Sequence, residues 1–166
     1  GRERLEAVRA IVGAGIPVMG HLGLTPQSVH QLGGFRAQGK TAMGARRLLE
    51  DALLLQEAGC FSLVLESIPD RLAEMVTQRL EIPTIGIGAG KGCAGQVLVT
   101  HDLLGLFDRF TPKFARRYAN IHAEMEQAFT AFKADVEMGA FPGTEHTTGI
   151  PEKEWQELLE GMRDDG

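Results

Sequence analysis

Polar residues follow each of four short apolar runs in this chain. They are His21, Glu66, the glycine-rich stretch 88–91, and the pair His101 and Asp102. In folds built from parallel strands, active sites form where the strands end. If the four apolar runs are strands, their ends together form the candidate site of the protein.

Glu66 is the strongest candidate for acid–base chemistry. It ends the apolar run 61–65, so its carboxylate is expected to be partly desolvated. Desolvation disfavours the charged form of a carboxyl group and makes the carboxylate a stronger base, which suits a general base. A structural role fits the position equally well, because the carboxylate could cap the next helix or pair with Arg71 or Arg79. The residues alone leave both interpretations open.

His21 is the second candidate. It lies in the stretch Gly20-His21-Leu22-Gly23, whose glycines let a substrate or another backbone segment approach closely. A histidine there could donate a hydrogen bond or transfer a proton. It could also be a loop histidine whose hydrogen bonds are satisfied within the protein.

Metal binding finds little support in the spacing of the other candidates. His101 and Asp102 could be ligands, but adjacent residues on a strand point to opposite faces. Three further histidines show no spacing typical of a metal site: His30, His122 and His146.

Two other patterns suggest chemistry only weakly. Cys60 and Cys93 have no neighbouring base in the sequence that would generate a thiolate. Residues 90–95 match G-x-G-x-x-G, but residues 96–99 favour a strand where the dinucleotide-binding fingerprint requires a helix.

The elements that must position these residues alternate between helix and strand. Helices are expected over 2–15, 41–58, 70–80 and 112–138, and strands over 16–19, 61–65, 82–87 and 96–100. Short strands that are apolar on both faces are typical of parallel sheets covered by helices. Two architectures fit: an open doubly wound sheet, or part of a (β/α)8 barrel, which needs eight strands.

The helix expected over 112–138 carries apolar residues at steps of three and four. It either packs on the sheet of its own chain or forms a seam for a partner helix or subunit. The residues after it are expected to be peripheral, with a small helix around Trp155.

Composition excludes several classes of protein. The 166 residues suffice for one domain with a core, and a formal net charge of −5 argues against nucleic acid as the main partner. No stretch approaches 18 apolar residues, so a membrane span is not expected. Two cysteines are too few for a disulfide framework, and a cytoplasmic location is expected.

Five segments carry a resemblance to a known family. They read Gly20-His21-Leu22-Gly23-Leu24-Thr25-Pro26-Gln27-Ser28, Leu63-Val64-Leu65-Glu66, Ile85-Gly86-Ile87-Gly88-Ala89-Gly90, Gly95-Gln96-Val97-Leu98-Val99 and Thr111-Pro112-Lys113-Phe114. In order and spacing, from about residue 5 to residue 146, the chain closely resembles the ketopantoate hydroxymethyltransferases. Ala94 departs from the family pattern, which has Asp before the Gly-Gln pair.

The resemblance implies a (β/α)8 TIM barrel and an enzyme of the pantothenate branch of coenzyme A synthesis. Such an enzyme transfers a one-carbon unit from 5,10-methylenetetrahydrofolate to 3-methyl-2-oxobutanoate and yields 2-dehydropantoate. Its Mg²⁺ chelates the keto acid and stabilises the enolate. By motif, the family's proton acceptor falls on Glu66, and its site histidine, expected to hydrogen-bond the substrate, falls on His21.

The resemblance also implies that part of the site lies outside this chain. The family's metal ligands, two Asp and one Glu, and its keto-acid-binding Ser and Lys belong to the first four strands, upstream of Gly1. The chain is therefore expected to form the C-terminal half of the barrel over 1–146, with a peripheral tail and short helix over 147–166. Family members are ring-like homo-oligomers, so a homo-oligomer is expected here as well.

Two alternatives stay open at this point. The chain could be a truncated, inactive half that only assembles with a full-length copy, or a related barrel enzyme that makes or breaks a C–C bond beside a 2-oxo acid. A half-barrel exposes strand edges and an apolar interior. Alone, it is expected to fold poorly, to self-associate, or to pair with its missing half.

Overall fold

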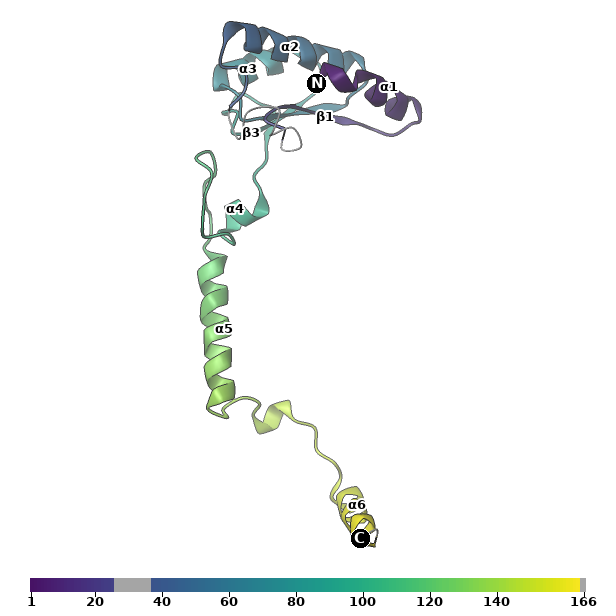
Figure 1. Cartoon of the computed structure of the whole chain (residues 1–166), viewed down its shortest axis with the longest axis vertical. Coiled ribbons are helices and arrows are strands. Elements are labelled where there is room, and N and C mark those ends of the chain that lie inside the picture. The colour runs from purple at the N-terminus through teal and green to yellow at the C-terminus, as the bar shows by residue number, and fades with distance from the viewer. Residues whose placement is uncertain (26–36, 165–166) are drawn as a thin grey trace. The chain divides into compact units, whose positions relative to one another are not determined.

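The computed structural model describes residues 1–25 and 37–164, in two compact units, Gly1–Ala119 and Asn120–Gly166 (Figure 1). The elements of the first unit are, in chain order, η1 (Arg2–Arg4), α1 (Leu5–Gly13), β1 (Met19–Gly23), α2 (Ala42–Glu57), β2 (Ser62–Glu66), α3 (Asp70–Arg79), β3 (Thr84–Ile87), β4 (Gly95–Gln96) and α4 (Thr100–Leu104). Those of the second unit are α5 (Ile121–Glu137), η3 (Thr144–His146) and α6 (Glu152–Asp164).

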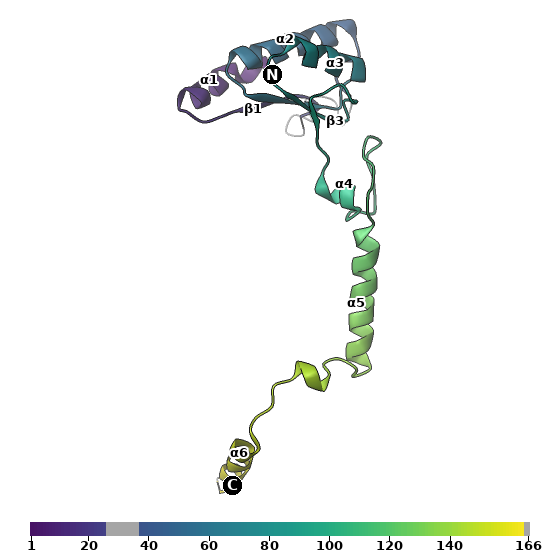
Figure 2. The same ribbon diagram turned by 180° about the vertical axis from the view of Figure 1, so that it is seen from behind.

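The four described strands form one parallel sheet in the order β1-β2-β3-β4. Helices α1, α2 and α3 lie on the same side of the strands in both views (Figure 1, Figure 2). A doubly wound sheet would reverse its strand order at a switch point and carry helices on both faces. The described part of the chain shows neither feature, and its strand order and one-sided helices match a segment of a (β/α)8 fold.

The core lies between the sheet and these helices. Helix α2 begins after Thr41, whose side chain accepts a hydrogen bond from the Gly44 N–H at 3.1 Å, as an N-cap residue does. Its apolar stripe and that of α3 meet the fully buried side chains of Leu63 and Leu65 on β2. Each large aliphatic side chain buried in this way contributes roughly 1.5–3 kcal/mol.

The opposite face of the sheet carries the candidate residues. Residues alternate in direction along a strand, so Val64 and Glu66 point away from the helices that cover Leu63 and Leu65. Both are partly exposed, as is His21 on the neighbouring strand. In a closed barrel, this face of the sheet would be the interior.

The expected strand 16–19 is wrong in position. Strand β1 begins at Met19 and includes His21, which was expected to follow the strand. Pro17 lacks an N–H donor and cannot take part in a full ladder. The chain is nonetheless extended there, and the Val18 carbonyl accepts from the Phe61 N–H at 3.0 Å.

The expected strand 96–100 is also wrong for most of its length. Pairing stops after Gln96, and Thr100–Leu104 forms α4, so His101 and Asp102 lie on a helix. Helix α4 ends at Gly105, which adopts the left-handed conformation (φ +64°). β-branched residues favour a strand only where neighbouring strands and helices pack against them.

The long helix begins at Ile121 and not at residue 112. Before it, the aromatic residues make tertiary contacts in place of helical turns. Phe114 packs against Gly88, and the Tyr118 N–H donates to the Leu103 carbonyl at 2.8 Å. These contacts override the helical periodicity of residues 112–120.

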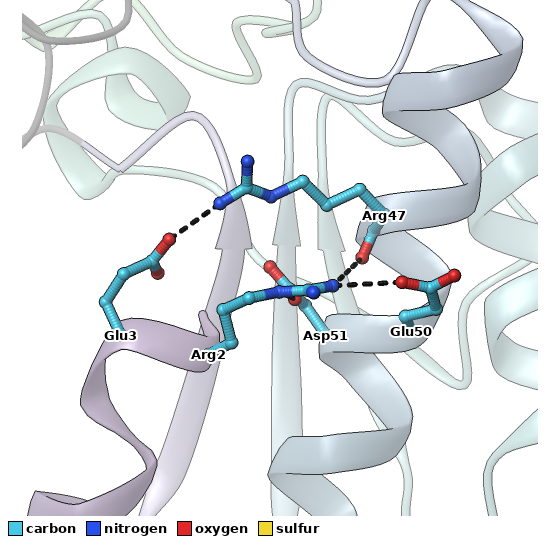
Figure 3. Close-up of polar contacts among 5 residues, drawn as sticks. All are labelled: Arg2, Glu3, Arg47, Glu50 and Asp51. Atoms are coloured by element: carbon cyan, nitrogen blue, oxygen red, sulfur yellow. Dashed lines mark hydrogen bonds and ion pairs between the residues drawn. The ribbon is translucent and has the colours of Figure 1, made fainter.

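A polar cluster fastens the start of the chain to α2 (Figure 3). The Arg2 guanidinium bonds Asp51 and Glu50, and the Arg47 guanidinium bonds Glu3 at 2.8 Å. The hydrogen bond to Asp51 is the main reason that the pKa of Arg2 is raised above its ordinary value. The cluster therefore connects η1 to α2 through ion pairs between oppositely charged side chains.

The second unit is a set of helices with local contacts. The Phe141 ring lies 5.4 Å from that of Phe132 and 5.0 Å from that of His146, measured between ring centroids. The expected small helix around Trp155 is present as α6. Within residues 1–25 and 37–164, no helix has both the length and the apolar character needed to cross a membrane.

Candidate active site

His21 and Glu66 form one hydrogen-bonded pair across β1 and β2. Parallel pairing sets His21 opposite Val64 and Gly23 opposite Glu66, so the two side chains belong to the same face of the sheet. The Nε2 atom of His21 lies 3.0 Å from Oε2 of Glu66. The His21 side chain is 31% exposed and that of Glu66 is 17% exposed, so a small molecule can reach the pair.

This contact separates two interpretations of Glu66. The sequence allowed an ion pair with Arg71 or Arg79, but in the structure the carboxylate bonds the ring of His21. In the first turn of α3, the carboxylate that accepts a backbone hydrogen bond is that of Asp70, from the Arg71 N–H at 2.8 Å. The Glu66 carboxylate therefore bonds His21 and also faces the open side of the sheet, where a ligand can reach it.

Gly23 lets β1 pass close to the end of β2. Its φ is +95°, and a Cβ atom placed on it would lie 2.1 Å from the carbonyl oxygen of Glu66. That oxygen also accepts from the Leu24 N–H at 2.9 Å. A side chain at position 23 would push the two strands apart at the His21–Glu66 pair.

Phe114 covers the end of the third strand. Gly88 follows β3 with φ +62°, and a Cβ atom there would lie 2.9 Å from the Phe114 ring. Ile87, directly before it, is paired with Glu66 in the sheet register. Reasoning from strand ends did not assign Phe114 to the site, although it belongs to the Thr-Pro-Lys-Phe segment that carried part of the resemblance.

The glycine-rich segment 88–94 is a connection between β3 and β4, with strand and not helix after it. The Gln96 side chain donates to the Gly90 carbonyl at 2.9 Å, and the Ala94 N–H donates to Oγ1 of Thr84 at 3.3 Å. The Thr84 hydroxyl in turn lies 2.7 Å from that of Thr77 on α3. This arrangement lacks the helix that dinucleotide binding requires at G-x-G-x-x-G.

The other candidates of the first unit lie elsewhere in it. His101 is exposed on α4, and Cys60 is buried beneath α2 with its thiol pKa raised by desolvation, which disfavours the thiolate. Cys93 lies beside Gly86 in the β3–β4 connection. His122 and His146 belong to the second unit, and His30 lies outside the described residues.

Comparison with known proteins identifies the family. A family model described as ketopantoate hydroxymethyltransferase matches residues 1–144. The chain belongs to this family. The resemblance carried by the five sequence segments is thereby confirmed.

Curated relatives carry the corresponding enzyme name. The chain is 56% identical over 164 residues to a 3-methyl-2-oxobutanoate hydroxymethyltransferase from Syntrophobacter fumaroxidans, and 54% identical over 167 residues to one from Oleidesulfovibrio alaskensis. Each alignment covers 99% of this chain and 58% of the relative. A third, from Clostridium botulinum, is 52% identical over 95% of this chain and 58% of the relative. The chain thus spans a little over half of the length of its relatives.

The described residues contain no large cluster of metal-ligating side chains. Mg²⁺ needs near-octahedral oxygen coordination, usually with one or two carboxylates. Residues 1–25 and 37–164 contain no group of three or more His, Cys, Asp or Glu side chains that could hold a metal ion. The carboxylate that the described strands place on the open face, that of Glu66, is hydrogen-bonded to His21.

Proposed function

We propose that this chain supplies the general base and one wall of the active site of a 3-methyl-2-oxobutanoate hydroxymethyltransferase. The reaction joins a one-carbon unit from 5,10-methylenetetrahydrofolate to C3 of 3-methyl-2-oxobutanoate and yields 2-dehydropantoate. The single observation that carries the proposal is the His21–Glu66 hydrogen bond at the ends of two parallel strands. Membership of the family supports the choice of substrates.

Glu66 is the group that removes the C3 proton. A carboxylate only accepts hydrogen bonds, so His21 must donate from Nε2 when Glu66 is ionised. That bond engages Oε2 and holds the carboxylate plane, which leaves Oε1 to receive the proton. The C3 carbon then forms its new bond to the methylene carbon, and both bonds from that carbon to the two folate nitrogens break. Water supplies the hydroxyl group, and the two nitrogens take up the proton removed from C3 and the remaining proton of the water.

The remainder of the site is proposed to lie outside this chain. A (β/α)8 barrel needs four more strands than the sheet described, and the relatives are longer than this chain. We propose that those strands close the barrel and bring the ligands of Mg²⁺ and the groups that hold the keto acid. Residues 1–146 would then be the C-terminal half of that barrel and 147–166 its tail.

Proton exchange tests the role of Glu66 without folate. The completed protein is a fusion of this chain to the preceding part of the Syntrophobacter fumaroxidans relative, which restores the full length. It is incubated with 3-methyl-2-oxobutanoate and Mg²⁺ in D₂O, and loss of the C3 proton is followed by NMR. We expect exchange that Glu66→Gln lowers by at least about 10²-fold, as expected for loss of a general base.

His101→Gln is the matched control, because His101 is polar, exposed and on α4. It should leave exchange unchanged. Exchange that survives Glu66→Gln would overturn the assignment of the base. A folded fusion without exchange would overturn the proposal that this chain contributes to a working site.

A second function is favoured by the exposed apolar side chains of α5, which suit docking on another chain. The chain would then be an inactive partner that assembles with a full-length copy. Co-expression with the Syntrophobacter fumaroxidans relative distinguishes the two: stable co-purification with no exchange attributable to this chain, judged with Glu66→Gln, favours the inactive partner.

A further inference from the structure

The residue after the candidate base has an unusual backbone conformation. Ser67 has φ +50°, and it is the one residue other than glycine with positive φ among residues 1–25 and 37–164. Side chains with a Cβ atom rarely adopt this region, and it is costliest for β-branched residues. Residues held in such conformations cluster at functional sites, where the surrounding structure enforces them.

Hydrogen bonds fix the peptide that joins Glu66 to Ser67 from both sides. The Glu66 carbonyl accepts from the Leu24 N–H after β1, and the Ser67 N–H donates to the Ile87 carbonyl at the end of β3, both at 2.9 Å. The Ser67 carbonyl accepts from the Gln38 N–H at 3.0 Å. The peptide plane next to the base is therefore held between the two neighbouring strands.

The chain beyond Ser67 is anchored as well. Ile68 is 3% exposed and packs in the core, and Pro69 directly precedes α3. A change of φ at Ser67 can thus be absorbed only by rotating the Glu66–Ser67 peptide. That rotation would break the bonds to Leu24 and Ile87, which hold the end of β2 between its neighbours, and so loosen the hold on Glu66 beside His21.

We propose that Ser67 is a positioning residue for Glu66, and that it acts through its left-handed backbone and not through its hydroxyl. The inference rests on the proposed function of Glu66 as the base. Both hydrogen bonds described for Ser67 are made by its backbone. The left-handed turn lets β2 end at Glu66 with its carboxylate 3.0 Å from Nε2 of His21 while the chain enters α3.

Three substitutions distinguish the effect of the Ser67 backbone conformation from that of its hydroxyl group. Ser67→Ala removes the hydroxyl and tolerates the left-handed region about as well as serine. Ser67→Thr keeps the hydroxyl but is β-branched and resists that region. Ser67→Gly adopts it without steric cost. All three are made in the completed protein, with circular dichroism to confirm folding.

Two readouts are measured. The ¹⁵N chemical shifts of the His21 ring report its hydrogen bond to Glu66, with Glu66→Ala as the reference for the broken bond. The C3 exchange rate reports the base. We expect the Ser67→Ala and Ser67→Gly variants to match the unmodified protein in both readouts. The Ser67→Thr variant should shift the His21 ring signal toward that of Glu66→Ala. It should also lower the exchange rate by about 10²-fold, as for a misplaced reacting group.

The opposite pattern, with Thr unchanged and Ala and Gly impaired, would overturn the proposal in favour of the hydroxyl. Equal values for all three variants would overturn it too. Should the Thr variant not fold, a shifted ring signal in both Ala and Gly still overturns it, and unchanged signals in a folded Ala and Gly pair support it. If the ring signals follow the expected pattern but no protein shows exchange, the positioning role of Ser67 is retained and the proposed function is rejected.

Discussion

At the scale of single residues, the pair His21 and Glu66 depends on a close approach of two strands. The side chains meet because Gly23 allows the β1 backbone to pass the carbonyl of Glu66. The hydrogen bond at 3.0 Å therefore depends on the absence of a side chain at Gly23, two residues away from His21. A site of this kind is sensitive to substitutions that never touch a substrate.

Gly23→Ala tests that condition. The added Cβ would lie 2.1 Å from the Glu66 oxygen, at a φ of +95° that alanine resists, so the strands must separate. We expect the free energy of unfolding of the completed protein to fall by about 1–3 kcal/mol and C3 exchange to fall with it. Denaturant unfolding and the exchange assay measure the two effects.

Gly13→Ala is the matched control. Gly13 is the last residue of α1, and a Cβ atom on it would meet nothing within 4 Å. The free energy of unfolding of the Gly13→Ala variant should stay unchanged or rise by less than about 1 kcal/mol. Equal losses in both variants would show that close approach at Gly23 is not the reason for the effect.

At the scale of elements, polar contacts decide how neighbouring segments are joined. The Thr77–Thr84 hydroxyl pair links α3 to β3, and the Ala94 N–H joins the β3–β4 connection to it. The Glu3–Arg47 and Arg2–Asp51 contacts join η1 to α2 (Figure 3). The first group is partly buried and the Glu3–Arg47 pair is exposed, so the two should respond differently to solution conditions.

The link between η1 and α2 should weaken in acid. A hydrogen bond from the backbone N–H of Glu3 and, after it, the charge of Arg47 lower the pKa of Glu3 from its ordinary value of 4.5. A lowered pKa in the folded chain contributes stability above the ordinary value, and this contribution is lost as pH falls through the folded pKa. The side chains of Arg47 and Glu3 are 61% and 63% exposed, so the contribution is small, about 0.2–1 kcal/mol.

Glu3→Gln should therefore lower the free energy of unfolding by that amount at neutral pH and by nothing once the carboxyl group of Glu3 is protonated. Denaturant unfolding from pH 7 downward measures the difference between the two proteins. Glu6→Gln is the control, because Glu6 is exposed on α1 outside the cluster drawn in Figure 3. A Glu3→Gln difference that grows as pH falls would contradict the sign of this argument.

For the molecule taken as a whole, the described sheet is open at both edges. Strands β1 and β4 are its two edges, and helices α1, α2 and α3 cover one face (Figure 1). Large apolar side chains of α5 are exposed as well: Met125, Phe129, Phe132 and Val136. Unpaired edges and exposed apolar surface favour association with other chains.

The chain by itself should therefore self-associate, whereas the completed protein should form a discrete homo-oligomer. Light scattering after size-exclusion chromatography, at several concentrations, measures both masses. Thermal unfolding of the chain alone should be broad, because one face of the described sheet is without covering helices (Figure 1). A monodisperse monomer that unfolds cooperatively would contradict this expectation.

Local signals along the chain predict most of the elements and the candidate chemistry. Helices α2 and α3 and strand β2 follow from apolar spacing, from the Thr41 cap and from the glycine and proline residues between them, because these signals act over a few residues. Glu66 and His21 were candidates on the same local grounds, and the five segments identified the family.

The way in which these elements combine follows from the fold. It placed His21 inside β1, brought it to 3.0 Å from Glu66, limited β4 to two residues, made residues 100–104 a helix and set Phe114 against Gly88. Each of these features depends on a partner far along the chain, such as Glu66 for His21, 45 residues away. Hydrogen-bond partners and strand register are non-local, so local periodicity does not contain them.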